Sequence, residues 1–299
     1  MSKPSIGFLG LGLMGSAMCQ RLLDLSYPLT VIANRSRENV DKAVARGAVE
    51  VKTAREVAER SDIVMLCMDT SASVESRMYG DDGVIAGLNP QAVTIDFGTS
   101  LPNSTRAIGE AVSAKDATYL DAPLGRTPAH ALDGALNIMC SGDRAAYDRV
   151  EPVLKDLGEN VFHLGALGSG HTIKLINNFF AMTTANAMAE AFAIADKMGV
   201  AREQVYAVMS AGPNHSSMMD FVKAYAVDGN SNALEFAIKN ANKDVGYYGQ
   251  MASDVNVDSI MSKSVREALS SAVDAGFGDK MVSEMVDFLA EKYAEPGSS

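Results

Sequence analysis

Three polar residues on one expected helix could carry out proton-transfer chemistry. Lys174, Asn177 and Asn178 are spaced i, i+3 and i+4, so a helix places them on one face. Leu, Ile, Phe, Met and Ala surround them, and polar groups in such surroundings need partners. The lysine could be a proton donor held by an amide, because an apolar site disfavours its charged form. Alternatively, its head group reaches solvent and the asparagines bond to neighbouring backbone.

A glycine-rich segment near the N-terminus could hold the phosphates of a cofactor. Gly10, Gly12 and Gly15 follow the apolar run 6–9 and precede a helical pattern at 17–25. Strand, glycine turn and helix form the context that a dinucleotide fingerprint requires. In such a loop the glycines allow a tight turn, close approach of a pyrophosphate and close packing of helix on strand. We expect the whole loop to bind the cofactor: Gly10, Leu11, Gly12, Leu13, Met14 and Gly15.

The residues after the second expected strand, 29–33, predict which cofactor binds. An acidic residue about 20 positions past the glycines would hydrogen-bond the ribose hydroxyls of NAD. This sequence instead has Asn34, Arg35, Ser36 and Arg37 at that place. Two guanidinium groups and two small hydrogen-bonding side chains suit a 2′-phosphate. We therefore expect NADPH, with NADH possible, and the alternative is a basic loop that is merely solvated.

The order of the expected elements predicts an α/β fold with a doubly wound parallel sheet. Apolar runs alternate with helical patterns, which implies βαβ units. Ligands bind at the carboxyl ends of such strands, and this points to the loops after Met68, Asp96 and Asp121. We expect the cofactor to contact Met68 and Thr99, and the substrate to contact Gly125, Arg126 and Thr127. The strands are expected at 6–9, 29–33, 62–68, 92–96, 135–140 and 161–163, and helices at 40–46, 54–60 and 145–157.

The pattern changes near residue 165, and everything after His171 is typical of helix. We therefore expect a Rossmann-type NAD(P)-binding domain over 1–164 and a helical domain over 165–299. A long connecting helix over about 172–198 is apolar nearly all round, which predicts that it is buried.

Composition excludes several classes of function. The net charge of −11 argues against nucleic acid and against anionic membrane surfaces as partners. No apolar stretch is long enough to span a bilayer. The three cysteines lack paired spacing, which predicts buried free thiols in the cytoplasm. The four histidines lack metal-ligand spacing, so no metal is expected.

Over essentially its whole length, the chain resembles the β-hydroxyacid dehydrogenase family, typified by 3-hydroxyisobutyrate dehydrogenase. The resemblance implies a Rossmann-type domain, a long connecting helix and a helical C-terminal domain that builds a homodimer or a tetramer. It rests on Gly-Leu-Gly-Leu-Met-Gly at 10–15, Asp121-Ala122-Pro123, Gly134-Ala135-Leu136, Gly168-x-Gly170, Lys174-Leu-Ile-Asn-Asn178, Lys243-Asp244 and Gly276-Phe277-Gly278-Asp279.

The same resemblance implies the activity and several roles. The family oxidises a small β-hydroxyacid with NAD(P), or reduces the matching semialdehyde. It implies that Lys174 is the catalytic lysine and that Asn178 orients it, with Asn177 near the substrate. Lys243 and Asp244 are implied to line the cleft, Lys243 for the cofactor and Asp244 for the substrate.

One segment departs from the family pattern. The usual Ser-Gly-Gly after Asp-Ala-Pro-x is Gly125-Arg126-Thr127 here, which looks like the sulfolactaldehyde reductases. We therefore expect reduction of 3-sulfolactaldehyde to 2,3-dihydroxypropane-1-sulfonate, although those enzymes generally use NADH. The alternative is a reductase of the 3-hydroxyisobutyrate, tartronate-semialdehyde, or succinic-semialdehyde or glyoxylate type. A further alternative is an imine reductase, although that branch usually lacks a lysine at 174. Arg126 is expected to hold the acidic head of the substrate, or else to pair with Asp133 or Asp121 at the surface.

Overall fold

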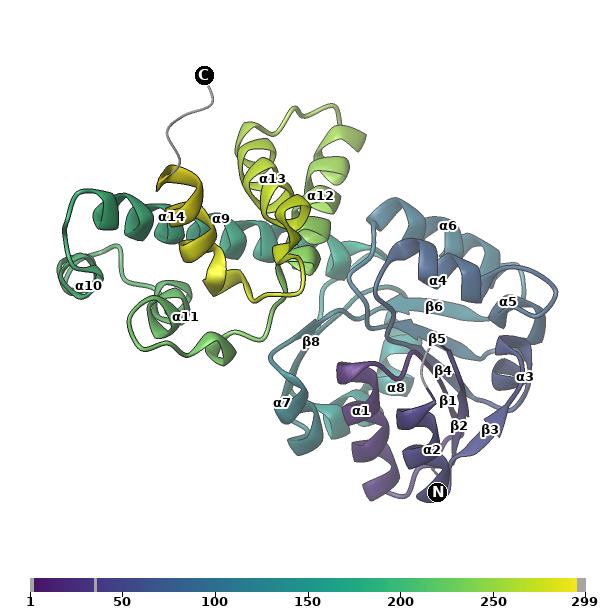
Figure 1. The fold of residues 1–299 in the computed structure, drawn as a ribbon. Coiled ribbons are helices and arrows are strands. Elements are labelled where there is room, and N and C mark those ends of the chain that lie inside the picture. Colours follow the sequence, from purple (N-terminus) through teal and green to yellow (C-terminus); the bar gives the residue numbers. More distant parts are fainter. Residues whose placement is uncertain (1–2, 35–36, 295–299) are drawn as a thin grey trace. The chain divides into compact units, whose positions relative to one another are not determined.

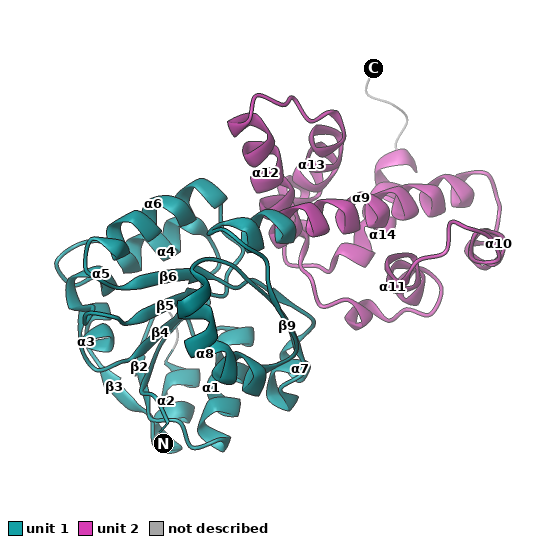
Figure 2. Ribbon diagram, turned by 180° about the vertical axis from the view of Figure 1, so that it is seen from behind, with its two compact units in different colours: residues 1–174 teal, residues 175–299 magenta. Residues whose placement is uncertain are grey.

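The computed structural model describes residues 3–34 and 37–294. Its contacts divide the chain into two compact units, Met1–Lys174 and Leu175–Ser299 (Figure 2). The first unit contains a parallel sheet with helices and the second is helical, which confirms the predicted fold class. The junction of the units lies inside a helix that starts at Ser169. The domain boundary near residue 164 stays a prediction.

A six-stranded parallel sheet forms the centre of the first unit, with strand order β3-β2-β1-β4-β5-β6 (Figure 1). The order reverses between β1 and β4, and the crevice at such a switch point is where ligands bind in open α/β sheets. Five strands are buried along nearly their whole length, as expected for a sheet covered on both faces. The strands are β1 (Ile6–Leu9), β2 (Leu29–Ile32), β3 (Val49–Val51), β4 (Ile63–Leu66), β5 (Val93–Asp96) and β6 (Thr118–Asp121).

Separate apolar cores lie on the two faces of this sheet. Phe8 and Leu9 are successive residues of β1, and their side chains enter different cores because successive side chains of a strand point to opposite faces. One core involves α1 (Leu13–Asp24), α2 (Glu38–Ala45), α7 (Pro128–Asp133) and α8 (Arg144–Leu157). The other involves α3 (Ala54–Glu59), α4 (Ser71–Met78), α5 (Val84–Gly87) and α6 (Pro102–Ser113).

A second, three-stranded sheet completes the first unit. It has the order β7-β8-β9, with β7 (Leu124–Gly125) antiparallel to β8 (Leu136–Cys140) and β9 (Gly158–His163) parallel to it. The strands expected at 135–140 and 161–163 are confirmed, and β9 begins earlier than expected. Sequence reasoning missed β3 and β7, because β3 has two exposed residues and β7 has only two residues in all.

The second unit is built from helices around one core. Its described residues form no strand, and Ala237 and Met281 make an isolated bridge. Helix α9 (Ser169–Lys197) enters this unit from the first. The other α-helices are α10 (Arg202–Ser210), α11 (Ser217–Ala226), α12 (Ile238–Asp254), α13 (Ile260–Ala272) and α14 (Met285–Ala294). Short 3₁₀ helices lie at Ser231–Ala233 and Val282–Glu284, and a π-helix lies at Val273–Phe277.

Helix α9 is buried on one face only, so the expectation of burial all round is wrong for the single chain. Met182, Ala185 and Ala189 pack into the core of the second unit. In contrast, Ile176 is 49% exposed and Phe180 is 72% exposed. One apolar stripe of the helix, which includes Met182, therefore joins the core, and a second, which includes Phe180, is exposed. The amino-acid composition alone does not show which of the two is buried. None of the helices within the described ranges is long and apolar enough to cross a membrane.

Candidate functional site

The glycine loop has the tight packing that its motif predicts. Gly10 has φ +93°, and a side chain there would meet the carbonyl oxygen of Cys67 at 2.3 Å and Met68 Sδ at 2.8 Å. A side chain on Gly15 would lie 1.9 Å from the carbonyl oxygen of Gly10. Both positions therefore require glycine. The contact at Gly10 also places Met68, an expected cofactor residue, directly against the loop.

Gly12 leaves the open space that a pyrophosphate needs. A side chain there would meet nothing within 4 Å, and Gly12 precedes α1 without a capping side chain. A helix start without a capping side chain favours an anion, because its first N–H groups lack helical partners. Asn39 Nδ2 donates a 2.8 Å hydrogen bond to the carbonyl oxygen of Leu11, which fastens the loop. The neighbouring Leu13 is 80% exposed. These features fit a dinucleotide cofactor.

The end of β2 carries the residues expected to face the ribose. Asn34 is exposed there, whereas Arg35 and Ser36 lie outside the described residues. Arg37 donates to both oxygens of Glu50 at 3.0 Å and to Asp41 Oδ1 at 3.0 Å, so carboxylates balance its charge. Arg77 Nη2 donates a 2.7 Å hydrogen bond to Asn34 Oδ1. Sequence reasoning missed Arg77, because nothing local links α4 to the end of β2.

A buried carboxylate at the end of β6 holds the start of α9. Asp121 has no exposed surface, and it accepts hydrogen bonds from the backbone N–H groups of Gly168 and His171, both at 2.8 Å. It also accepts from the hydroxyl of Ser141, whose oxygen in turn accepts from the N–H of Gly170 at 2.9 Å. The otherwise unbonded N–H groups at this helix start thus have charged or polar partners.

A second buried carboxylate extends this polar cluster to β5. Asp96 accepts from the N–H of Gly98 and from the hydroxyl of Ser100, both at 2.8 Å. The His171 ring is fully buried between the two carboxylates, with Nε2 3.7 Å from Asp96 Oδ2 and Nδ1 3.8 Å from Asp121 Oδ2. Its Nδ1 also lies 2.7 Å from Thr105 Oγ1. His171 thus connects the start of α9 to the ends of β5 and β6.

Lys174, Asn177 and Asn178 follow on α9, as their spacing predicted. Lys174 is half-buried, Asn177 is exposed and Asn178 is 7% exposed. Asn178 Nδ2 donates a 2.7 Å hydrogen bond to Asp244 Oδ2. Asp244 is itself buried, and Lys243 Nζ lies 2.9 Å from its Oδ1. The amide of Asn178 is thus held by a buried carboxylate that is paired with a cation.

The loop expected to hold the substrate contains an arginine with a strained backbone. Arg126 has φ +76°, the left-handed region that favours glycine. Its Nη1 donates to the carbonyl oxygen of Ala135 at 2.7 Å and to Glu159 Oε2 at 2.5 Å. The surface partner is therefore Glu159, and neither Asp133 nor Asp121 takes that place. Gly125 pairs with Asn137 across the second sheet, and Thr127 precedes α7 with its Oγ1 2.8 Å from His130 Nδ1.

The cysteines and the potential metal ligands among the described residues do not form a reactive site. All three cysteines are free; Cys19 and Cys140 are buried and Cys67 is half-buried. Burial, with a contribution from the charge of Asp96, raises the pKa of Cys67 to about 12. Within residues 3–34 and 37–294, no three His, Cys, Asp or Glu side chains gather as metal ligands would. Thr99, an expected cofactor residue, is half-buried just after β5.

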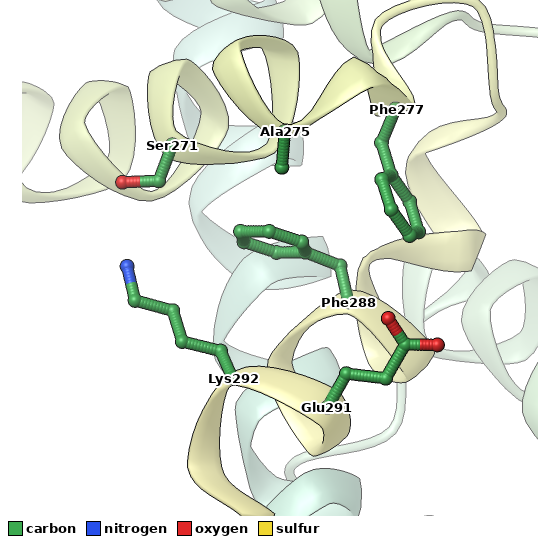
Figure 3. A pocket seen from close by; sticks show the side chains of 6 residues that line it. All are labelled: Ser271, Ala275, Phe277, Phe288, Glu291 and Lys292. Atoms are coloured by element: carbon green, nitrogen blue, oxygen red, sulfur yellow. The ribbon is translucent and has the colours of Figure 1, made fainter. Parts of the chain in front are cut away.

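The second unit contains a cavity of about 410 Å³ that the predicted residues do not line (Figure 3). Phe277 and Phe288 form an apolar wall with ring centroids 5.4 Å apart. Ser271, Glu291 and Lys292 add polar groups around it. No group in this cavity matches the chemistry of the glycine loop or of Lys174, so we assign it no role.

Glycine loop, strand order and the lysine of α9 together define a dinucleotide-binding oxidoreductase of the Rossmann type. Residues 5–165 match the NAD binding domain of 6-phosphogluconate dehydrogenase. Residues 168–289 match the NAD-binding domain of NADP-dependent 3-hydroxyisobutyrate dehydrogenase. The chain therefore belongs to the 3-hydroxyisobutyrate dehydrogenase-like β-hydroxyacid dehydrogenase family, whose members act on CH–OH groups with NAD(P).

Individual relatives agree with this assignment. A probable 3-hydroxyisobutyrate dehydrogenase-like 3, mitochondrial, from Arabidopsis thaliana is 32% identical, over 84% of this chain and 78% of its own. The 3-sulfolactaldehyde reductase of Escherichia coli (strain K12) is 29% identical over 92% of both chains. The solved structure of Mycobacterium tuberculosis 3-hydroxyisobutyrate dehydrogenase has the same fold, with a TM-score of 0.87 at 23% identity, covering 96% of this chain and 99% of its own.

Proposed function

We propose that the protein reduces a small anionic aldehyde to its alcohol with NADPH, using Lys174 as the proton donor. The observation that carries this proposal is the anchoring of α9. Asp121 fastens the start of this helix to the end of β6, and Lys174 lies one turn further along. Asn178 follows after one more turn, with its amide held by Asp244.

The residues of the chain supply the proton chemistry. The glycine loop at Gly10, Gly12 and Gly15 would hold the dinucleotide, whose nicotinamide would supply the hydride for the carbonyl carbon of the aldehyde. The carbonyl oxygen gains negative charge and takes a proton from Lys174 Nζ, which leaves a neutral amine and the product alcohol. In the reverse direction the neutral amine accepts the hydroxyl proton. A positioned acid of this kind contributes about 10²- to 10⁴-fold to the rate. Asn178 orients the lysine or the hydroxyl, because Asp244 restrains its amide.

Arg126 is proposed to bind the acidic head of the substrate. Non-glycine residues with a strained backbone cluster at ligand sites, and Arg126, with φ +76°, is a residue of this kind. Glu159 now balances its charge, so a substrate anion would replace Glu159 as the partner. A sulfonate presents oxygens that match the donor fork of a guanidinium. The resemblance to sulfolactaldehyde reductases at positions 125–127 makes 3-sulfolactaldehyde our first candidate substrate.

Steady-state kinetics with paired aldehydes tests this assignment. We expect Arg126→Ala to raise KM about tenfold or more for an anionic C3 aldehyde and much less for a neutral aldehyde of the same size. Glu159→Gln should lower KM for the anionic aldehyde, because it removes the competing carboxylate. Equal slowing of charged and neutral aldehydes by Arg126→Ala would contradict the proposal. If the wild type prefers a carboxylate semialdehyde, such as that of tartronate, succinate or 3-hydroxyisobutyrate, only the sulfonate assignment fails.

NADPH is the proposed cofactor because residues 34–37 contain no carboxylate that would repel a 2′-phosphate. Asn34, Arg35 and Ser36 supply hydrogen-bond donors there. Comparing kcat/KM for NADPH and NADH in the wild type tests this preference, and equal values would contradict it.

An imine reductase is the second candidate, since a C=N bond also accepts a hydride. Lys174 argues against it, and a panel of aldehydes and imines with the wild type separates the two activities. We also propose a homodimer or tetramer, because an apolar stripe of α9 that includes Ile176 and Phe180 is exposed in the single chain. Sedimentation equilibrium tests that assembly state. A cytoplasmic location stays a prediction.

A further inference from the structure

Arg77 lies at the place where the cofactor's ribose is expected. It belongs to the last turn of α4, and its Nη2 donates a 2.7 Å hydrogen bond to Asn34 Oδ1. Asn34 comes two residues after the end of β2. In Rossmann-type domains this position faces the 2′ group of the adenosine ribose. The guanidinium of Arg77 is therefore within hydrogen-bond reach of a side chain beside that group.

Arg77 is better placed to bind a phosphate than Arg37, which lies three residues after Asn34 in the sequence. Arg37 makes ion pairs with Glu50 and Asp41, so little of its charge is left for a ligand. Arg77 has no carboxylate partner within the described part of the chain. A guanidinium has five N–H donors, and the contact with Asn34 uses one of its nitrogens. The side chain is thus a cation with a planar donor fork and no acidic partner there.

The bond to Arg77 also sets the orientation of Asn34. Because Oδ1 of the amide accepts from Arg77, the Nδ2 donors are turned away from that bond. Both side chains then present donors, and a phosphate ester presents only acceptor oxygens near neutral pH. The pair is complementary to a 2′-phosphate, whereas the ribose hydroxyl of NADH brings no negative charge to balance Arg77.

We propose that Arg77 binds the 2′-phosphate directly and is a specificity-determining residue for NADPH. This inference rests on the proposed NADPH preference and adds a residue from α4 that the loop at 34–37 does not contain. It predicts that removal of Arg77 weakens binding of the phosphorylated cofactor and leaves binding of the unphosphorylated one nearly unchanged.

Calorimetric titration of the full-length protein with 2′,5′-ADP and with 5′-AMP tests the inference without turnover. The variants are Arg77→Gln, Arg77→Lys and a control, Arg149→Gln. Arg149 is a matched control because its Nη2 also donates a single hydrogen bond, to the carbonyl oxygen of Gln91 before the amino end of β5. That edge of the sheet lies opposite to the carboxyl ends of the strands, where the nucleotide is expected. Thermal melting of each variant checks the fold.

We expect Arg77→Gln to weaken binding of 2′,5′-ADP about tenfold. Its affinity for 5′-AMP should stay within twofold of that of the wild type. Arg77→Lys should keep part of the affinity because it keeps the charge, and Arg149→Gln should bind both like the wild type. If the wild type prefers 2′,5′-ADP and Arg77→Gln retains that preference, the role of Arg77 is overturned while the NADPH proposal stands. Equal weakening of both nucleotides by Arg77→Gln also overturns it. If the wild type does not discriminate, the NADPH proposal fails first and the role of Arg77 falls with it.

Discussion

Asp121→Asn tests how strongly the buried carboxylate at the end of β6 holds α9. The substitution keeps the size of the side chain and replaces one acceptor oxygen with an NH₂ donor. One oxygen of Asp121 faces the N–H of His171, and the other faces the N–H of Gly168 and the hydroxyl of Ser141. Ser141 cannot adapt freely, because its oxygen accepts from Gly170. Either orientation of the new amide therefore places a donor against a buried donor.

The size of the effect follows from these contacts. A buried donor without a partner costs about 1–3 kcal/mol, and loss of charge assistance in the remaining bonds costs about 1 kcal/mol more. Neutralising a buried carboxylate also removes part of its desolvation cost, which favours the variant. We therefore expect the free energy of unfolding to fall by about 2–3 kcal/mol. For a unit of this size that corresponds to a decrease in Tm of roughly 4–12 °C.

Thermal and urea unfolding of the wild type and the variant measure this loss. Asp148→Asn is the control, because Asp148 forms an exposed pair with Arg144 and should contribute less than about 0.5 kcal/mol. We also expect Asp121→Asn to lower kcat, since a displacement of Lys174 by about 1 Å can cost about 10²-fold. Loss of less than 0.5 kcal/mol, equal to the control, would refute the anchoring of α9 by Asp121.

Three further outcomes are expected. Arg35→Asp should reverse the cofactor preference in a comparison of kcat/KM for NADPH and NADH, because a carboxylate repels the 2′-phosphate and accepts from ribose hydroxyls. The free energy of unfolding of Arg126→Gly should be about 1 kcal/mol higher than that of Arg126→Ala, since glycine adopts φ +76° without strain. Cys67 should resist iodoacetamide in the native protein at pH 8 and react after unfolding, because its pKa of about 12 keeps the thiol protonated.

Local patterns in the sequence predicted much of the fold and the packing of the glycine loop. Gly10, Gly12 and Gly15 lie within one strand–turn–helix segment, so their spacing alone predicts where the chain packs tightly and where it leaves open space. The buried parallel strands are continuous apolar runs, which the sequence displays directly. The same reasoning failed for β3, because its exposed residues give no apolar run. It also failed for the exposed stripe of α9, because apolar side chains do not reveal which stripe joins the core.

Contacts between distant residues could not be predicted in the same way. Asn178 and Asp244 are 66 positions apart, and Arg77 and Asn34 are 43 apart. Such pairs depend on where the fold brings two elements together, and one sequence contains no periodic signal for that. The family resemblance marked Asp244 for the substrate, but it did not indicate the hydrogen bond to Asn178.

The most direct test of the proposed chemistry is single-turnover reduction by Lys174→Ala, measured beside binding of the reduced cofactor. We expect the rate of the chemical step to fall by roughly 10²-fold or more, because the alkoxide loses its proton donor. The affinity for NADPH should stay within about twofold of the wild type, since the glycine loop and the end of β2 are unchanged. A variant with near-normal turnover and normal cofactor binding would contradict the role of Lys174 as general acid.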